Sequence, residues 1–171
     1  MTVTAVRKDT EALSLTVDAE FPASPDRVWQ PWSDPRQLEQ WWGPPTYPAT
    51  FTKHELKPGG RVDYHMTGPD GDQHHAYWEV QEVDPPHSLT VRDGFAGEDG
   101  SPNTEMPTNE LRVTIEEIAE GRTRMSIVSV FPSTEAMEQL IAMGMAEGLT
   151  AAVGQIDAIL ADESVAEPAH D

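Results

Sequence analysis

Residues 57–71 read KPGGRVDYHMTGPDG and contain one short strand between two turns. The turn signals are PGG near the start of this stretch and PDG at its end. Between them Val62, Tyr64 and Met66 alternate with polar residues, and this period of two places all three on one face of a strand. The stretch therefore predicts an antiparallel sheet whose strands follow one another through tight turns.

The same alternation continues on both sides of this stretch. Turn residues separate the apolar runs, which favours a meander over parallel strand-helix-strand units. The segment 97–107 is acidic and contains Gly and Pro, so it predicts a mobile hairpin loop. The last strand leaves two sets of core residues open, either Met125, Ile127 and Phe131 or Val128 and Val130. The predicted strands are 13–21, 50–56, 61–67, 75–83, 88–95, 109–118 and 122–131.

Two short helices are predicted between the first and second strands. Ser24 offers an N-cap and is followed by a proline at the first helical position. Asp34 repeats this signal and opens a second helix that runs toward Trp41. Pro31 interrupts the first helix and should end or kink it.

A long helix is predicted at the C-terminal end, over residues 135–160. Ser133 and Thr134 precede it as capping residues, and Glu135 places an acid in its first turn. Apolar residues recur along one face of this helix, which is typical of a buried stripe. The stripe consists of Met137, Ile141, Met145, Leu149, Ala152, Ile156 and Ile159.

The net charge of the chain limits the kinds of partner that it can be expected to bind. Its 171 residues include 30 acidic and 11 basic side chains, a formal net charge of −19. A field of this sign repels phosphate backbones and anionic lipid headgroups, so no nucleic acid and no membrane is expected as a partner. The apolar run 140–160 contains Glu147, Gln155 and Asp157, which are costly in hydrocarbon. With no secretory signal visible, a cytoplasmic protein is expected.

The chain length fits one domain. Residues 13–161 are predicted to form it, with an N-terminal extension at 1–12 and an acidic disordered tail at 162–171. The chain has no cysteine, so disulfides, thiolate metal sites and cysteine nucleophiles are excluded.

Three motifs resemble those of a known family. Residues 21–44, FPASPDRVWQPWSDPRQLEQWWGP, residues 57–71, quoted above, and residues 82–91, EVDPPHSLTV, are similar to bacterial homologues of the activator of heat-shock protein 90 ATPase. The likeness covers about 13–160. It implies the α+β helix-grip fold of the START, polyketide-cyclase and pollen-allergen superfamily, a curved antiparallel sheet wrapped around a long C-terminal helix. The eukaryotic co-chaperones carry a further N-terminal domain, which this chain does not show.

Such a fold leaves room for an apolar pocket between sheet and helix. Aromatic and methionine side chains suit an adaptable apolar site, although the same residues also make an ordinary core. Gly148 lies four residues after Gly144 on one helix face, where both remove side-chain volume. Tyr64 either gives a ligand a polar contact or is a core tyrosine. The candidate ligand-binding residues are Trp41, Trp42, Tyr64, Met66, Trp78, Phe95, Met145, Gly148 and Leu149.

No catalytic centre is predicted, and neither a cofactor nor a metal is expected. Asp63 and Glu79 each lie within an apolar strand, but alternation turns both away from the pocket. His74 and His75 are adjacent, so in a strand they point to opposite faces and cannot share one ion. The spacing of histidines that is typical of zinc sites is absent from the sequence.

Three hypotheses follow for function. The first is a non-catalytic binding protein that holds an apolar or lipid-like small molecule between sheet and helix. The second is a protein-interaction role with a chaperone or another protein partner, in line with the resemblance. The third is a cyclase- or hydrolase-type enzyme, which requires an ionisable pocket residue with a perturbed pKa. Whether the chain forms a homodimer stays open.

Overall fold

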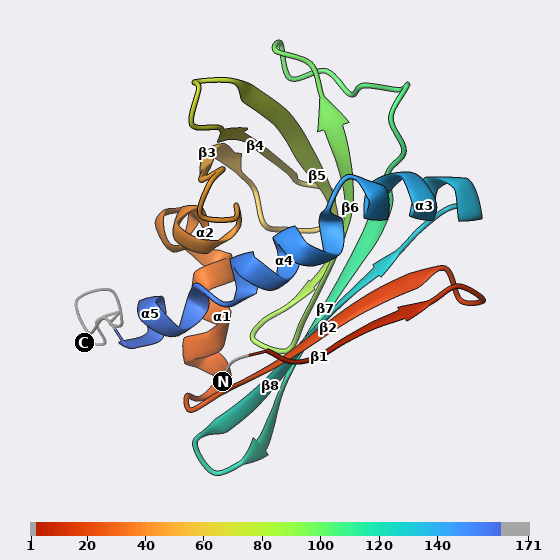
Figure 1. Ribbon diagram of the computed structural model, residues 1–171. Helices are drawn as coiled ribbons and strands as arrows, with labels where there is room; N and C mark the ends of the chain where they lie inside the picture. The colour runs from red at the N-terminus through yellow and green to blue at the C-terminus, as the bar shows by residue number, and fades with distance from the viewer. Residues whose placement is uncertain (1–2, 162–171) are drawn as a thin grey trace.

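Residues 3–161 are described by the structure, which is a computed structural model (Figure 1). Two short helices follow the second strand, and three helices close the described chain. The strands are β1 (Val3–Asp9), β2 (Ser14–Phe21), β3 (Ala49–His54), β4 (Arg61–Thr67), β5 (Gln73–Asp84), β6 (Ser88–Ala96), β7 (Asn109–Ala119) and β8 (Arg122–Val130). The helices are α1 (Pro25–Ser33), α2 (Pro35–Trp41), α3 (Thr134–Ala142), α4 (Met145–Val153) and α5 (Ile156–Ala161).

All eight strands form one antiparallel sheet in the order β1-β2-β8-β7-β6-β5-β4-β3. From β3 to β8 each strand pairs with the next along the chain, as the turn signals predicted. β2 joins the other end of this series by pairing with β8. The sheet curves around the C-terminal helices (Figure 1), which confirms the predicted α+β helix-grip fold.

β1 is a strand that the sequence analysis did not predict. It pairs with β2 from the register Val3↔Ala19 to Asp9↔Ser14 and forms one edge of the sheet. Its side chains are mostly exposed. A strand with so little buried surface lacks the clear alternation of apolar and polar residues from which the other strands were predicted.

The two short helices form where the caps predicted them. The Ser24 hydroxyl accepts a hydrogen bond from the Arg27 N–H at 3.3 Å, and the Asp34 carboxylate accepts one from the Arg36 N–H at 2.9 Å. Pro31 lies inside α1, which ends two residues later at Ser33. The first helix is therefore short, in agreement with the prediction.

The C-terminal helix is not continuous, which corrects the prediction of one helix over 135–160. Gly144 has a φ of +92° and separates α3 from α4. This left-handed conformation costs a residue with a Cβ roughly 1–2 kcal/mol. The second interruption follows α4 at Gly154. The three segments nevertheless follow one another along the concave face of the sheet (Figure 1).

The buried apolar residues form two separate clusters. The main cluster joins the inner face of the sheet to α1, α2, α4 and α5 and includes Trp32, Trp41 and Trp78. The smaller cluster lies under α3 and consists of Leu15, Phe131, Met137, Leu140 and Ala146.

In β8 the structure decides between the two core alternatives. Met125 and Ile127 are fully buried, and Phe131 just beyond the strand is also buried, whereas Val128 and Val130 keep some exposure. Met125, Ile127 and Phe131 are therefore the core set.

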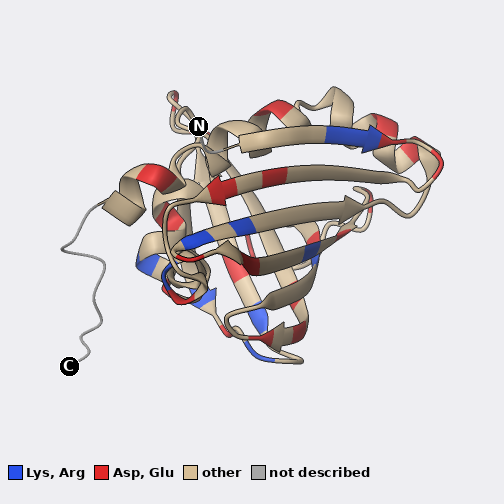
Figure 2. Ribbon diagram, turned by 90° about the horizontal axis from the view of Figure 1, so that it is seen from below, with Lys and Arg blue, Asp and Glu red and all other residues tan. Residues whose placement is uncertain are grey.

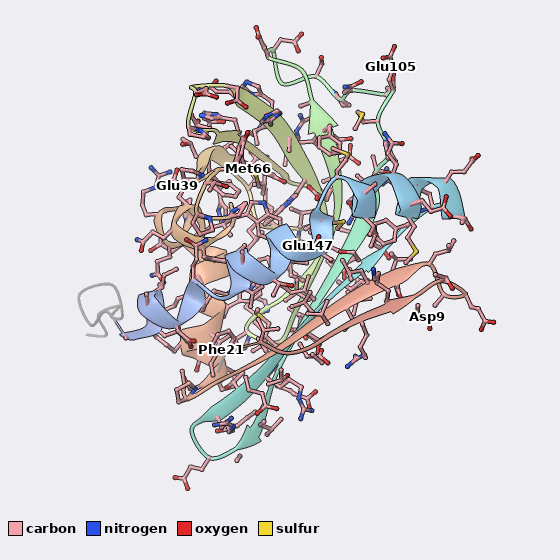
Figure 3. The ribbon with its side chains drawn as sticks, viewed as in Figure 1. Asp9, Phe21, Glu39, Met66, Glu105 and Glu147 are labelled. Carbon is pink, nitrogen blue, oxygen red and sulfur yellow. The ribbon has the colours of Figure 1, made fainter. Side chains whose placement is uncertain are left out.

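Acidic side chains are spread over strands and helices, as Figure 2 shows. On the C-terminal helices Glu147 is an exposed example (Figure 3). In residues 3–161 no helix combines the length and the hydropathy needed to cross a bilayer. The predicted tail lies outside the described residues.

Candidate functional site

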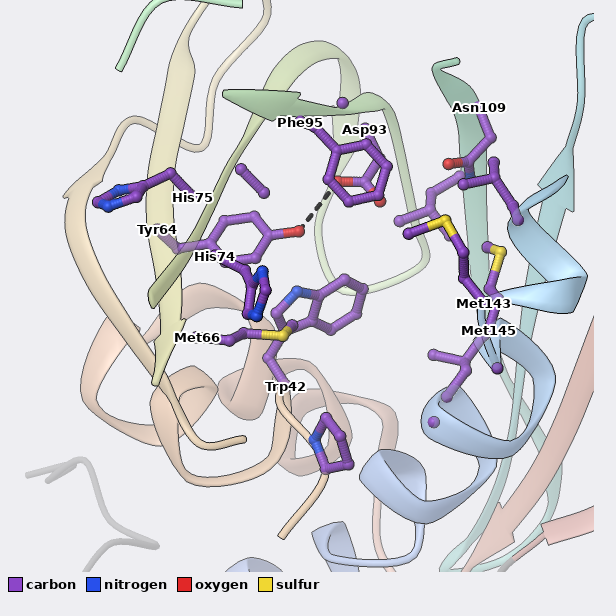
Figure 4. A pocket seen from close by; sticks show the side chains of 18 residues that line it. Trp42, Tyr64, Met66, His74, His75, Asp93, Phe95, Asn109, Met143 and Met145 are labelled. Carbon is purple, nitrogen blue, oxygen red and sulfur yellow. Dashed lines mark hydrogen bonds between the residues drawn. The ribbon is translucent and has the colours of Figure 1, made fainter. Parts of the chain in front are cut away.

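A cavity of about 270 Å³ lies between the sheet and the kinked C-terminal helices (Figure 4). This volume is close to the lower limit of the volumes of small-molecule pockets, which is roughly 300 Å³. β4, β5, β6 and β7 supply one wall, and α3 and α4 supply the other. The lining residues are Trp42, Pro44, Tyr64, Met66, His74, His75, Ala76, Asp93, Gly94, Phe95, Asn109, Leu111, Leu140, Met143, Gly144, Met145, Gly148 and Leu149.

Most of the candidate residues from the sequence come together in this lining. They are Trp42, Tyr64, Met66, Phe95, Met145, Gly148 and Leu149. Met66 lies at the β4 side of the cavity (Figures 3 and 4). Whether these residues contact a ligand stays a prediction.

Trp41 and Trp78 are not part of the lining. Both are fully buried in the main cluster. The Trp41 ring packs edge-on against Trp32 at a centroid distance of 4.8 Å, and its indole N–H donates to the Pro31 carbonyl at 3.0 Å. Trp78 packs edge-on against Trp42 at 5.0 Å. These two tryptophans support the cavity wall from behind.

The glycines on α4 give the cavity its width on the helix side. A Cβ added at Gly144 or Gly148 would meet no atom within 4 Å. Both positions therefore leave open space where most residues would place a side chain. The neighbouring Met143 is 56% exposed, so the cavity reaches the surface at the break between α3 and α4.

One part of the cavity wall is polar. The Tyr64 hydroxyl donates a hydrogen bond to Asp93 Oδ1 at 3.0 Å (Figure 4). Asp93 on β6 pairs in register with Trp78 on β5 and with Asn109 on β7. Side chains directly opposite on one sheet face have Cβ atoms about 4.5–5.5 Å apart. The carboxyl and the amide are therefore neighbours.

Burial raises the pKa of Asp93 to about 7. The Tyr64 hydroxyl and the nearby Trp78 indole lower the pKa and partly offset this rise. Burial, together with the negative charge of Asp93, raises the pKa of Tyr64 well above its ordinary value. The Tyr64 hydroxyl thus stays protonated as a donor, while Asp93 exists both as acid and as carboxylate near neutral pH.

Three buried N–H groups around this pair lack a well-aligned hydrogen-bond partner among residues 3–161. They are Asn109 Nδ2, Trp42 Nε1 and Trp78 Nε1. The case of Asn109 is the clearest, because its side chain lines the cavity and is only 6% exposed. An unpaired buried amide costs about 1–3 kcal/mol, so this position favours a polar group supplied from the cavity.

Asp93 was not among the residues predicted from the sequence, although the pattern of β6 contains the signal for it. Leu89, Val91, Asp93 and Phe95 alternate along β6, so the carboxyl faces the same side as two buried aliphatic residues. The two strand acids named from the sequence, Asp63 and Glu79, form ion pairs with Arg61 and Arg92 outside the cavity.

The histidines near the cavity lie at its rim. His74 is exposed and has its Nε2 at 2.9 Å from Asp72 Oδ2. His75 packs against His65 on the neighbouring strand, with the ring centroids 5.3 Å apart. Within the described part of the chain, no three His, Asp or Glu side chains cluster as metal ligands would.

Comparison with known proteins places the chain in a family. Residues 22–161 match the family described as "Activator of Hsp90 ATPase homolog 1-like protein". No match was found among curated proteins.

Several solved structures resemble the chain over nearly its whole length. A crystal structure from Mycobacterium smegmatis is 49% identical, covers 94% of this chain and 98% of its own, and has a TM-score of 0.86. A solution structure from Arthrobacter aurescens is 48% identical, covers 99% and 98%, and has a TM-score of 0.90. A Staphylococcus epidermidis structure, 25% identical over 92% and 93%, has a TM-score of 0.79.

Proposed function

Because the chain belongs to the Activator of Hsp90 ATPase homolog 1-like family, whose fold is suited to binding small molecules, we propose that it binds an apolar small molecule in the cavity between sheet and C-terminal helices. The observation that carries this proposal is the cavity itself. Aliphatic, aromatic and methionine side chains line most of it, and two glycines keep the helix wall open. Burying a ligand's hydrocarbon there would contribute roughly 25 cal/mol per Å² of apolar area.

Gly148 offers a direct test, because a side chain placed there extends into open space. Gly148→Leu should fill the cavity and abolish ligand binding without unfolding the protein. Ala151→Leu is the matched control, because Ala151 lies on the same helix and is exposed. Native mass spectrometry of freshly purified protein, followed by denaturing release, would detect a bound molecule. A ligand that the Gly148→Leu variant retains as well as the control does would contradict the cavity as its site.

A second candidate function is proton transfer by Asp93. It is favoured by one observation: a cavity carboxyl whose pKa is raised to about 7 by burial, a value suited to a general acid or base at neutral pH. The released ligand would then differ chemically between wild type and Asp93→Asn. Identical ligand from both proteins, after equal incubation, would remove this candidate.

The chaperone-linked role stays a prediction of the family resemblance. Its test is a pull-down and an ATPase assay with the chaperone of the same host. Absence of both binding and a rate effect would remove it.

A further inference from the structure

The polar part of the cavity contains a carboxyl beside the buried N–H groups described above. Among residues 3–161, the Tyr64 hydroxyl is the one group that makes a well-aligned hydrogen bond to the Asp93 carboxyl. The Trp78 indole also lies near the carboxyl and lowers its pKa. Figure 4 draws the oxygen of Asn109 on the side of Asp93. A ligand group with several N–H donors would hydrogen-bond to the Asp93 carboxyl and to the neighbouring Asn109 oxygen.

The charges around this point have one sign. None of the 18 residues that line the cavity is Lys or Arg. The ionisable side chains in the lining are Asp93 on β6, Tyr64 on β4, and His74 and His75 at the rim on β5. β7, α3, α4 and the segment after α2 that holds Trp42 and Pro44 contribute only uncharged residues to it. Among these lining residues Asp93 is therefore the only one with a carboxyl, and none carries a fixed positive charge.

Aromatic residues line the cavity that contains the carboxyl. Trp42, Tyr64 and Phe95 all line the cavity, and the rings of Trp42 and Tyr64 meet edge to face at 6.2 Å. The faces of aromatic rings attract cations, by about 0.5–2 kcal/mol for each contact. The net charge of −19 also raises the local concentration of cations near the protein and lowers that of anions.

We infer that the ligand is an amphipathic amine, whose ammonium group binds at Asp93 and Asn109 and whose hydrocarbon part lies against the methionines and leucines of α3 and α4. This inference rests on the proposed binding function and adds the chemical class of the ligand. A carboxylic acid of the same shape would place two like charges together. An alcohol would make fewer charge-assisted hydrogen bonds.

Three probes of matched shape distinguish these classes: decylamine, decanol and decanoate, each kept below its micelle-forming concentration. Calorimetry at about pH 8 should give wild type an affinity for decylamine at least about tenfold above that for decanol, as expected for one hydrogen bond to a charged group. Decanoate should bind weakest. Lowering the pH to about 5 should reduce the preference for the amine, because Asp93 is then protonated.

Two variants separate binding in the cavity from binding at the acidic surface. Asp93→Asn should lose the preference for the amine and keep the affinity for decanol within about threefold. Asp63→Asn, which removes an acid that does not line the cavity, should keep the preference. Gly148→Leu should bind none of the three, and amine binding that survives in this variant would assign the amine to the surface and overturn the inference.

The relative affinities of the three probes for wild type decide between the inference and the proposed function. Decanol or decanoate binding as tightly as decylamine would overturn the amine inference and leave the proposed function standing. Failure of all three probes to bind wild type would contradict the hydrocarbon cavity and the inference together.

Discussion

Asp93 on β6 and Asn109 on β7 lie directly opposite each other in the sheet, so a carboxyl and an unpaired buried amide share the wall of the cavity. Neither group is well satisfied there. Burial disfavours the charged form of Asp93, and the amide nitrogen of Asn109 has no partner within residues 3–161. Groups that reduce the stability of the empty protein in this way are typical of positions that serve a ligand.

Asp93 should make the protein less stable as the pH rises. Its folded pKa of about 7 lies above the ordinary value of 3.8. Its stabilising contribution is thus complete below about pH 4 and is lost as the pH rises to about 7, by on the order of 4 kcal/mol. Asp93→Asn does not titrate, so its stability relative to wild type should increase over this window. Urea unfolding at several pH values measures the difference, and an equal increase in Asp63→Asn would assign the effect to net charge instead.

Tyr64→Phe should raise the pKa of Asp93 above its value in wild type. The Tyr64 hydroxyl donates to the carboxyl at 3.0 Å and lowers its pKa, so its removal leaves the burial effect less opposed. Titration of the Asp93 carboxyl by NMR or infrared spectroscopy follows this change. A lower pKa in the variant would contradict the role assigned to the hydrogen bond.

Asn109→Leu should stabilise the empty protein by about 1 kcal/mol, because it removes a buried amide nitrogen without a partner. Thr123→Val is the contrasting variant. The Thr123 hydroxyl is also buried but donates to the Ala23 carbonyl at 2.6 Å, so its loss should destabilise by about 1 kcal/mol. Thermal unfolding of both variants measures whether each change stabilises or destabilises the protein. Destabilisation by Asn109→Leu would show that the amide has a hydrogen-bond partner in solution.

Alanine at the two cavity glycines should act in opposite directions. Gly148 lies inside α4 with open space around it, so Gly148→Ala should stabilise by about 1 kcal/mol through helix propensity. Gly144→Ala should destabilise by about 1–2 kcal/mol, because alanine disfavours a φ of +92°. Unfolding of both variants tests this, and equal effects would contradict the left-handed break.

The strands and short helices could be predicted from the sequence because their signals are local. Turn residues, caps and alternation identify them without knowledge of the rest of the fold. The break in the C-terminal helix could not be predicted, since the apolar stripe continues past Gly144. A glycine within such a stripe is compatible with a helix and with a left-handed turn, and tertiary packing decides between them.

The site was only partly predictable. Trp42 and Trp78 are both aromatic residues with buried neighbours, yet one lines the cavity and the other lies behind it. Residue type alone does not tell whether a buried side chain lines the cavity or lies behind its wall, because the same residue types fill cores and line apolar pockets. Asp93 could have been found by following the alternation of β6 to the one carboxyl on its inner face.

The cavity also lies between the two hydrophobic clusters. Trp42 and Tyr64 belong to the main cluster, whereas Leu140 belongs to the smaller one under α3. A molecule bound there would therefore touch both and join them into a single continuous interior. Because α3 packs on the smaller cluster, we expect it to open locally at a lower free energy than the rest of the chain when no ligand is bound. A bound ligand would fill the space between the two clusters as a buried side chain does. We therefore expect the two clusters to unfold together, in one cooperative transition, when the ligand is bound.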